Sequence, residues 1–178
     1  MQRTFDTLAL YGICGVLGVA FYYQFGHGEL PCPLCALQRV GFVIAGVALM
    51  LNVRTGYSPA HYGLALLSAV AAGSASLRQI ALHVVPGSGH YGSALFGFHF
   101  YTWALVGYGA LVVYVGLMLM VARVADERAR VGRAGPLTQL ACWLFILLAL
   151  ANAAAFLAEC GVGPCPDDPT GYLWWPKF

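Results

Sequence analysis

Charged side chains are scarce in this chain of 178 residues. They make up 9% of the sequence, whereas 60% is hydrophobic, and the mean hydropathy is +0.74. A soluble domain carries roughly 25% charged residues, so this chain has too little polar surface to face water. The scarcity excludes a soluble globular domain and predicts an all-α integral membrane protein that lies in a lipid bilayer.

A basic cluster on a folded polar face is also missing. Nine Lys and Arg residues stand against seven Asp and Glu residues, and the net charge is +2. Nothing in this balance indicates a nucleic-acid partner, and we expect none.

Long apolar stretches are what the chain has instead. The first of them is not followed by a small-x-small cleavage site, so we interpret it as a retained span and not as a signal peptide. We expect residues 1–178 to form a single transmembrane domain, an antiparallel helix bundle with a tail at 159–178. Its expected spans are 8–25, 36–52, 60–82, 100–122 and 137–158.

The arginines between the spans indicate an orientation. With five spans, most of them fall on one side of the membrane, and the opposite loops and tail hold only Lys177. The positive-inside rule places the arginine-rich side in the cytoplasm, with the N-terminus. The C-terminus is then expected on the outer side, which in a bacterial cell is the oxidising periplasm beyond the inner membrane. The arginines on the cytoplasmic side are Arg3, Arg54, Arg123, Arg128, Arg130 and Arg133.

Two close pairs of cysteines stand out. Cys32 and Cys35 precede the second span, and Cys160 and Cys165 follow the fifth. Four crossings separate the pairs, so both are expected on the same outer side, where disulfides persist.

The first pair lies in a setting that favours thiolate. Pro33 suits the first turn of a helix, and a helix that starts there puts Cys35 and Arg39 on one face. The positive end of a helix and a nearby guanidinium both stabilise a thiolate. From these residues alone, a redox pair and a metal clip both stay open.

The motif Cys32-Pro-Leu-Cys35-Ala-Leu-Gln-Arg39, at the start of a second span, resembles the DsbB family of disulfide bond formation proteins. The resemblance extends over most of the chain through the fourth span. It implies a four-span core and a membrane enzyme that re-oxidises a periplasmic thiol oxidase of the DsbA type and passes the electrons to ubiquinone or menaquinone. It also implies that Cys35 is the quinone-proximal thiol, that Cys32 exchanges with a second cysteine pair, and that Arg39 faces the quinone.

This sequence departs from the family pattern. The outer loop at 83–99, where the family carries its second pair, has no cysteine, and a fifth span is added. We infer that Cys160 and Cys165 have taken over the exchange role. The histidine that the family places late in the third span falls on Gln79, so Arg78, Gln79 and His83 are the candidates for that side of a quinone pocket.

Several alternatives remain open at this stage. Arg39 could be an interfacial anchor, and Cys160 and Cys165 could form a purely structural disulfide. The four cysteines together could build a structural zinc site. A vitamin K epoxide reductase-like enzyme, or a reductase that runs the same parts backward, would also use a Cys-x-x-Cys pair and a quinone.

Overall fold

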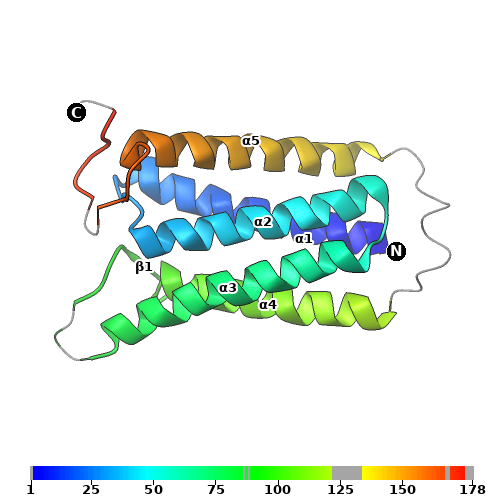
Figure 1. The fold of residues 1–178 in the computed structure, drawn as a ribbon, viewed down its shortest axis with the longest axis horizontal. Helices are drawn as coiled ribbons and strands as arrows, with labels where there is room; N and C mark the ends of the chain where they lie inside the picture. The colour runs from blue at the N-terminus through cyan, green and yellow to red at the C-terminus, as the bar shows by residue number, and fades with distance from the viewer. Residues whose placement is uncertain (1, 86, 88, 122–133, 167–168, 175–178) are drawn as a thin grey trace.

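Five long helices run side by side along one bundle (Figure 1). The computed structural model describes residues 2–85, 87, 89–121, 134–166 and 169–174. Outside the described residues lie Lys177 and the arginines predicted between the fourth and fifth spans: Arg123, Arg128, Arg130 and Arg133.

The helices follow one another along the chain with short connections. Helix α1 covers Gln2–Phe21 and continues as a π-helical turn, η1, at Tyr22–Gly26, and the later helices are α2 Pro33–Thr55, α3 Pro59–His83, α4 Phe100–Val121 and α5 Pro136–Cys160. All five are long and apolar enough to cross a membrane. The prediction of an all-α membrane bundle with five spans is therefore confirmed.

Proline marks the start of three of these helices. Pro33, Pro59 and Pro136 each occupy the first turn, where a missing backbone N–H costs nothing because it would have no helical partner. Helix α2 starts at Pro33, ahead of the span expected at 36–52, so the condition that puts Cys35 and Arg39 on one helix is met.

The first helix begins earlier than its apolar stretch predicted, at Gln2 and not at residue 8. The cause is tertiary. Asp6 is buried, and its carboxylate accepts hydrogen bonds from the hydroxyls of Tyr62 and Tyr114, at 2.7 and 2.6 Å. These bonds join α1 to α3 and α4, so the polar N-terminal part of α1 packs against the bundle as helix.

Small residues let the helices approach closely. A Cβ atom at Gly41 of α2 would lie 2.2 Å from the Cβ of Ala72, and one at Gly46 would lie 2.2 Å from the ring of Phe145. Gly41 therefore permits the α2–α3 contact and Gly46 the α2–α5 contact, as is common between helices in membranes. Away from these contacts, large apolar side chains such as Leu67, Leu147 and Met120 are exposed, which suits a surface that faces lipid.

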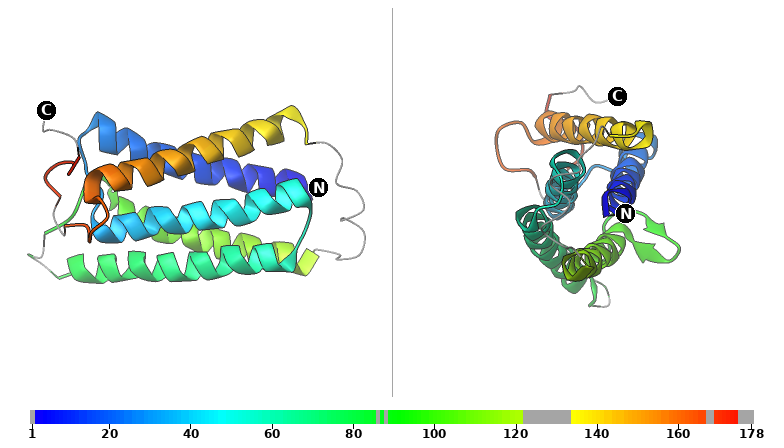
Figure 2. Two further views of the ribbon diagram at one scale, coloured as in Figure 1. Left: turned by 45° about the horizontal axis from the view of Figure 1, so that its top comes forward. Right: turned by 90° about the vertical axis from the view of Figure 1, so that its right-hand side faces the viewer.

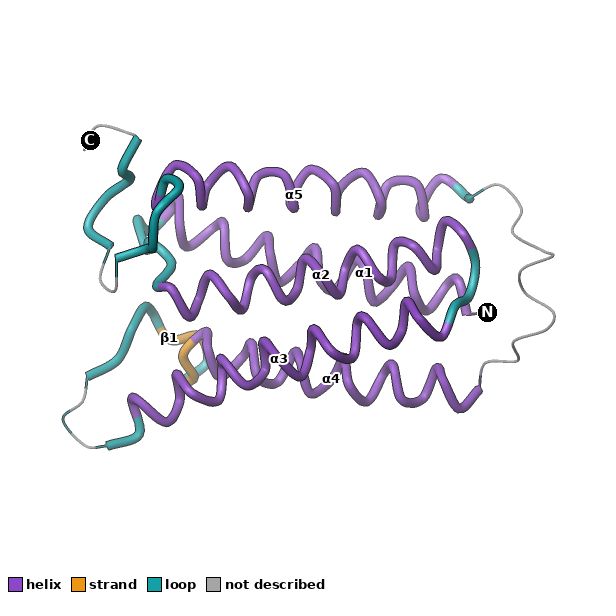
Figure 3. The backbone as a smooth tube through the Cα atoms, viewed as in Figure 1, coloured by secondary structure: helices purple, strands orange, loops and turns teal. Residues whose placement is uncertain are grey.

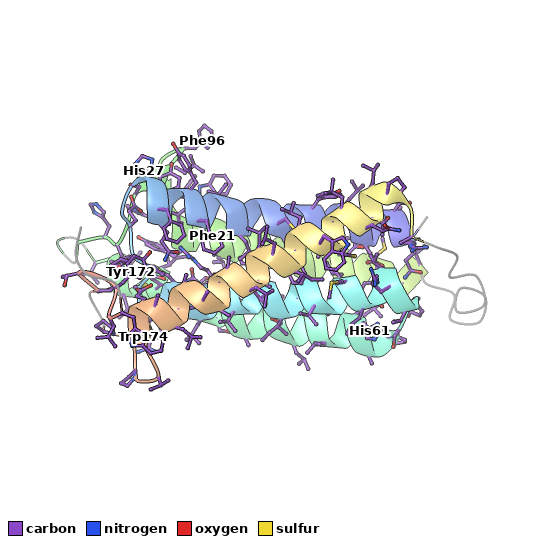
Figure 4. All side chains as sticks on the ribbon, turned by 90° about the horizontal axis from the view of Figure 1, so that it is seen from above. Phe21, His27, His61, Phe96, Tyr172 and Trp174 are labelled. Carbon is purple, nitrogen blue, oxygen red and sulfur yellow. A yellow bond between two sulfur atoms is a disulfide. The ribbon has the colours of Figure 1, made fainter. Side chains whose placement is uncertain are left out.

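The loop predicted at 83–99 is partly ordered as a β-hairpin. Strand β1, Ala94–Leu95, pairs antiparallel with β2, Phe98–His99 (Figure 3). Phe96 and Gly97 form the tip with positive φ angles of 51° and 83°, and the exposed Phe96 points away from the bundle (Figure 4).

Both cysteine pairs lie at the same end of the bundle. The start of α2 and the tail after α5 lie together at one end, opposite the N-terminus and the α2–α3 turn (Figures 1 and 2). Figure 4 shows Tyr172 and Trp174 of the tail at this end and His61 of α3 at the other. This arrangement agrees with the four crossings that were predicted between the two pairs. The side of the membrane on which this end lies stays a prediction.

Candidate active site

The first cysteine pair is built into the start of α2. Cys32 is the N-cap residue, with an extended backbone conformation, and its sulfur accepts a hydrogen bond from the backbone N–H of Cys35 at 3.1 Å. Cys32 is buried and Cys35 is half-buried, and both are free thiols. Because N–H groups at a helix N-terminus carry partial positive charge, this position stabilises negative charge on Cys32.

The amide of Gln79 holds both sulfurs from α3. Its Nε2 lies 3.3 Å from Sγ of Cys32 and 3.5 Å from Sγ of Cys35. Its Oε1 accepts a hydrogen bond from Nε2 of Gln38 at 2.8 Å, which fixes the amide so that its N–H groups face the sulfurs. Gln79 is 1% exposed, and it therefore acts as a fixed donor inside the bundle.

These contacts make Cys32 the more acidic thiol. The hydrogen bond from the Cys35 side chain is the largest cause, and it lowers the pKa of Cys32 from 9.0 to about 7 against the opposing effect of burial. Backbone N–H groups and the Gln79 amide lower it further. Cys32 is therefore substantially ionised near neutral pH.

Arg39 points into the bundle toward α1. One of its N–H groups donates to Oε1 of Gln24, another donates to the carbonyl of Ala20 at 3.2 Å, and the guanidinium lies 5.8 Å from the centre of the Phe21 ring. An arginine that only anchors the helix in the headgroups would extend to the surface. These contacts instead fix a cation between α1 and α2.

A cavity of about 450 Å³ opens beside this pair, within the size range of small-molecule sites. It lies between α1, α2 and α4 beside the loop that connects α3 to α4, and Cys35, Gln38 and Arg39 line it together. Most of its wall is apolar, and its aromatic side chains are Tyr23, Phe42, Tyr91, Phe100, Tyr101 and Trp103.

The three other residues predicted around a quinone all belong to α3. None of Arg78, Gln79 and His83 lines the cavity. Arg78 is exposed on α3. Nδ1 of His83 lies 2.8 Å from the carbonyl of Gln79, and its ring stacks on Tyr101, which does line the cavity. The structure thus places Gln79 at the sulfurs, His83 one layer behind the cavity and Arg78 outside it.

The second cysteine pair closes a small ring after α5. Cys160 and Cys165 form a disulfide, which uses the two thiolates that a four-cysteine zinc site would need. Gly161 turns the chain between them with φ of +62°, and a side chain there would meet Leu173. Glycine alone adopts this conformation readily, so the ring depends on it.

The tail returns to the first pair through Tyr172. Its hydroxyl accepts a hydrogen bond from Nε2 of Gln24 at 3.0 Å, and Gln24 in turn accepts one from Arg39. The backbone N–H of Trp174 also donates to the carbonyl of Ala158 at 3.1 Å. Tyr172 and Trp174 thus hold the tail against α1 and α5.

Three functional candidates were missed from the sequence: Gln24, Gln38 and Glu159. All three are buried polar side chains in apolar helices, a class that is costly in a membrane and therefore a signal for function. That signal was present in the sequence.

Comparison with known proteins gives one family. The family model described as disulfide bond formation protein DsbB matches residues 2–92. Similar curated proteins, each named disulfide bond formation protein B, come from Marinobacter nauticus (43% identical over 76 residues), Chromobacterium violaceum (38% over 77) and Hahella chejuensis (32% over 89). The aligned parts cover 40, 40 and 48% of this chain and 45, 46 and 54% of those proteins.

The chain thus spans about half the length of the relatives it matches, and no solved structure matches it. The family match ends at residue 92, earlier than the resemblance through the fourth span had suggested. The first cysteine pair and Gln79 lie inside the matched region, whereas α4, α5 and the second pair lie outside it.

Proposed function

Because the chain belongs to the DsbB family of disulfide bond formation proteins, we propose that it is a quinone-dependent oxidase of periplasmic thiols. In this proposal it re-oxidises a DsbA-like thioredoxin-fold oxidase and passes the electrons through two cysteine pairs to the membrane quinone pool. The observation that carries the proposal is the position of Cys35 and Arg39, one helical turn apart in the wall of one apolar cavity.

The wall of this cavity suits a quinone head group. Flat aromatic side chains line it. Arg39 and Gln38 supply N–H groups that can donate hydrogen bonds to a quinone oxygen. Ubiquinone or menaquinone would be held by these residues beside Cys35. When bound, the quinone supplies an acceptor for two electrons and two protons.

The chain's own residues prepare the thiols for this transfer. The amide of Gln79 and the N-terminus of α2 stabilise a thiolate on Cys32. Arg39 offers a fixed positive charge to negative charge that develops in the cavity, and such a charge is worth most where water is excluded. The cavity wall beside Cys35 is mostly apolar.

The tail disulfide provides the entry point for electrons. A thiolate of the reduced partner attacks the Cys160–Cys165 bond, and the partner's second thiolate then resolves the mixed disulfide, which leaves an oxidised partner and a reduced tail pair. The tail dithiol next reduces a Cys32–Cys35 disulfide in the same way. Each exchange moves two electrons. Because Cys165 is half-buried and Cys160 is buried, we assign the attack by the partner to Cys165.

Turnover of the intact protein tests this proposal. The full chain in lipid nanodiscs is mixed with ubiquinone, or with menaquinone, and a reduced DsbA-like protein, and the loss of partner thiols is followed. Wild-type protein should oxidise the partner catalytically, and Cys32→Ser and Cys35→Ser should abolish turnover. Cys14 and Cys142 are buried and free, so Cys14→Ser/Cys142→Ser serves as the matched control. If the partner stays reduced with both quinones, the proposal fails, and net reduction of an oxidised partner by quinol would assign the reverse direction.

A further inference from the structure

Glu159 is a buried carboxylate that the exchange steps above do not use. It lies in the last turn of α5, immediately before Cys160, and it is 2% exposed. Neither of its carboxylate oxygens has a hydrogen-bond partner among the residues that the structure describes. An ionised carboxylate buried in this way is costly unless a counter-charge faces it or it holds a proton.

The groups that face Glu159 come from two other segments. Arg39 of α2, Cys32 at the N-cap of α2 and Tyr172 of the tail interact with it electrostatically. The hydrogen bonds that Arg39 donates go to Gln24 and Ala20. Both of these acceptors are neutral, so the positive charge of Arg39 is not neutralised by a hydrogen-bonded carboxylate. Glu159 and a Cys32 thiolate are then two negative charges that compete for one guanidinium.

We propose that Glu159 is the proton partner of Cys32, taking up a proton when the Cys32 thiolate forms and giving it up when that thiolate is consumed. The proton balance is Cys32–SH plus Glu159–COO⁻ to Cys32–S⁻ plus Glu159–COOH, and no electron moves in this step. No hydrogen bond joins Glu159 to either sulfur, so it acts through the charge on Cys32 and is a positioning residue. This inference rests on the proposed redox cycle of the Cys32–Cys35 pair.

The exchange of one proton keeps the charge of the site constant. With a Cys32–Cys35 disulfide, Glu159 supplies the single negative charge that balances Arg39. With a reduced pair, the Cys32 thiolate supplies it and Glu159 is neutral. A second buried negative charge, which would be repelled by the first, is avoided in both states.

Infrared difference spectroscopy tests the protonation of Glu159 directly. The full chain in nanodiscs is reduced chemically, without partner or quinone, and reduced-minus-oxidised spectra are recorded at neutral pH. Wild-type protein should gain a band of a protonated carboxyl on reduction, and Glu159→Gln should lose that band. Glu29→Gln is the matched control, because Glu29 lies at the same end but its carboxylate already accepts hydrogen bonds from Ser93.

Cys32→Ser separates the two cysteine pairs in this measurement, because it retains the tail disulfide. The band should be absent from Cys32→Ser. A band that persists there would mean that Glu159 responds to the tail thiols, and a wild-type spectrum with no band that depends on Glu159 would mean that it does not exchange a proton. Either result overturns the proposal.

The pH dependence of Cys32 alkylation gives an independent readout that a merely structural role would not move. Without the competing carboxylate, the midpoint for Cys32 in Glu159→Gln should fall by about one pH unit. Glu159→Asp should restore a midpoint close to that of the wild type, and an unchanged midpoint in Glu159→Gln contradicts the proposal. Since neither measurement uses quinone or partner, a failure here is distinct from a failure of the thiol oxidase function.

Discussion

Cys32 differs from an ordinary buried thiol because its sulfur caps a helix. A buried thiol without donors resists ionisation, since burial disfavours the charged form. Here the Cys35 thiol, the backbone N–H of Cys35 and the Gln79 amide all point at one sulfur. At the scale of residues, these donors outweigh burial and favour the thiolate form of Cys32.

The reactivity of Cys32 should follow pH accordingly. Its pKa is lowered from 9.0 to about 7, so its reaction with iodoacetamide should be slow below pH 7 and should reach a plateau above it. Cys35→Ala removes the largest cause and should move the midpoint up toward 9.0, whereas Cys35→Ser, which keeps a donor, should move it less. Mass spectrometry of the peptide that contains Cys32 measures both shifts, and equal midpoints in wild type and Cys35→Ala would contradict the account.

Arg39 should matter for catalysis more than for folding. Arg39→Gln removes the fixed cation of the cavity wall, and we expect about 100-fold loss of quinone reduction with little change in helix content by circular dichroism. Arg39→Lys keeps the charge but not the two-armed contact with Gln24 and Ala20, so it should retain intermediate activity. If Arg39→Gln reduces quinone at the wild-type rate, Arg39 is only an anchor.

The sequence predicted single residues best where their function depends on neighbours in the chain. The shared face of Cys35 and Arg39 follows from spacing on one helix, and the structure places both in the cavity wall. Glu159 and Gln24 depend on contacts with other segments, such as the bond from Gln24 to Tyr172 across 148 positions. A local pattern contains no information about such pairings.

At the scale of elements, the tail is an exposed loop that is held to the bundle by hydrogen bonds at Tyr172 and Trp174. Gly161 turns the chain into the disulfide ring, and Tyr172 and Trp174 bind it back to α1 and α5. This leaves the Cys165 side of the ring more accessible than the Cys160 side. In the proposed exchange, this difference in exposure favours attack by the partner at Cys165.

A partner with only one active-site cysteine can reveal which of Cys160 and Cys165 is attacked. Without its second cysteine, a DsbA-like protein cannot resolve the mixed disulfide, and the adduct should accumulate on Cys165. Tandem mass spectrometry of the adduct identifies the attacked residue. Cys165→Ser should prevent the adduct at this position. An adduct found mainly on Cys160 of the wild type would show that exposure does not determine which sulfur is attacked.

The elements themselves were predicted well, because five apolar stretches and the proline at the start of α2 are strong local signals. The early start of α1 was missed, since it depends on Asp6 bonding to tyrosines of α3 and α4. The hairpin at 94–99 was missed as well. Its two-residue strands are too short to show an alternating pattern.

At the scale of the whole molecule, the bundle gathers both cysteine pairs and the cavity at one end. If that end faces the periplasm, a membrane-impermeant maleimide added to spheroplasts should label Cys165 after mild reduction. Thr55→Cys, placed at the opposite end of α2, should react only after the membrane is permeabilised. The reverse pattern would contradict the orientation predicted from the arginines.

The most direct test of the central claim is a single anaerobic turnover without partner. Fully reduced protein is mixed with excess ubiquinone, and quinone absorbance and protein thiols are followed together. The account predicts that one quinone is reduced for every two thiols lost, and that Cys32→Ser and Cys35→Ser abolish the reaction while Cys14→Ser/Cys142→Ser does not. Quinone that stays oxidised beside the reduced wild-type protein, or that is reduced equally well without Cys35, would contradict it.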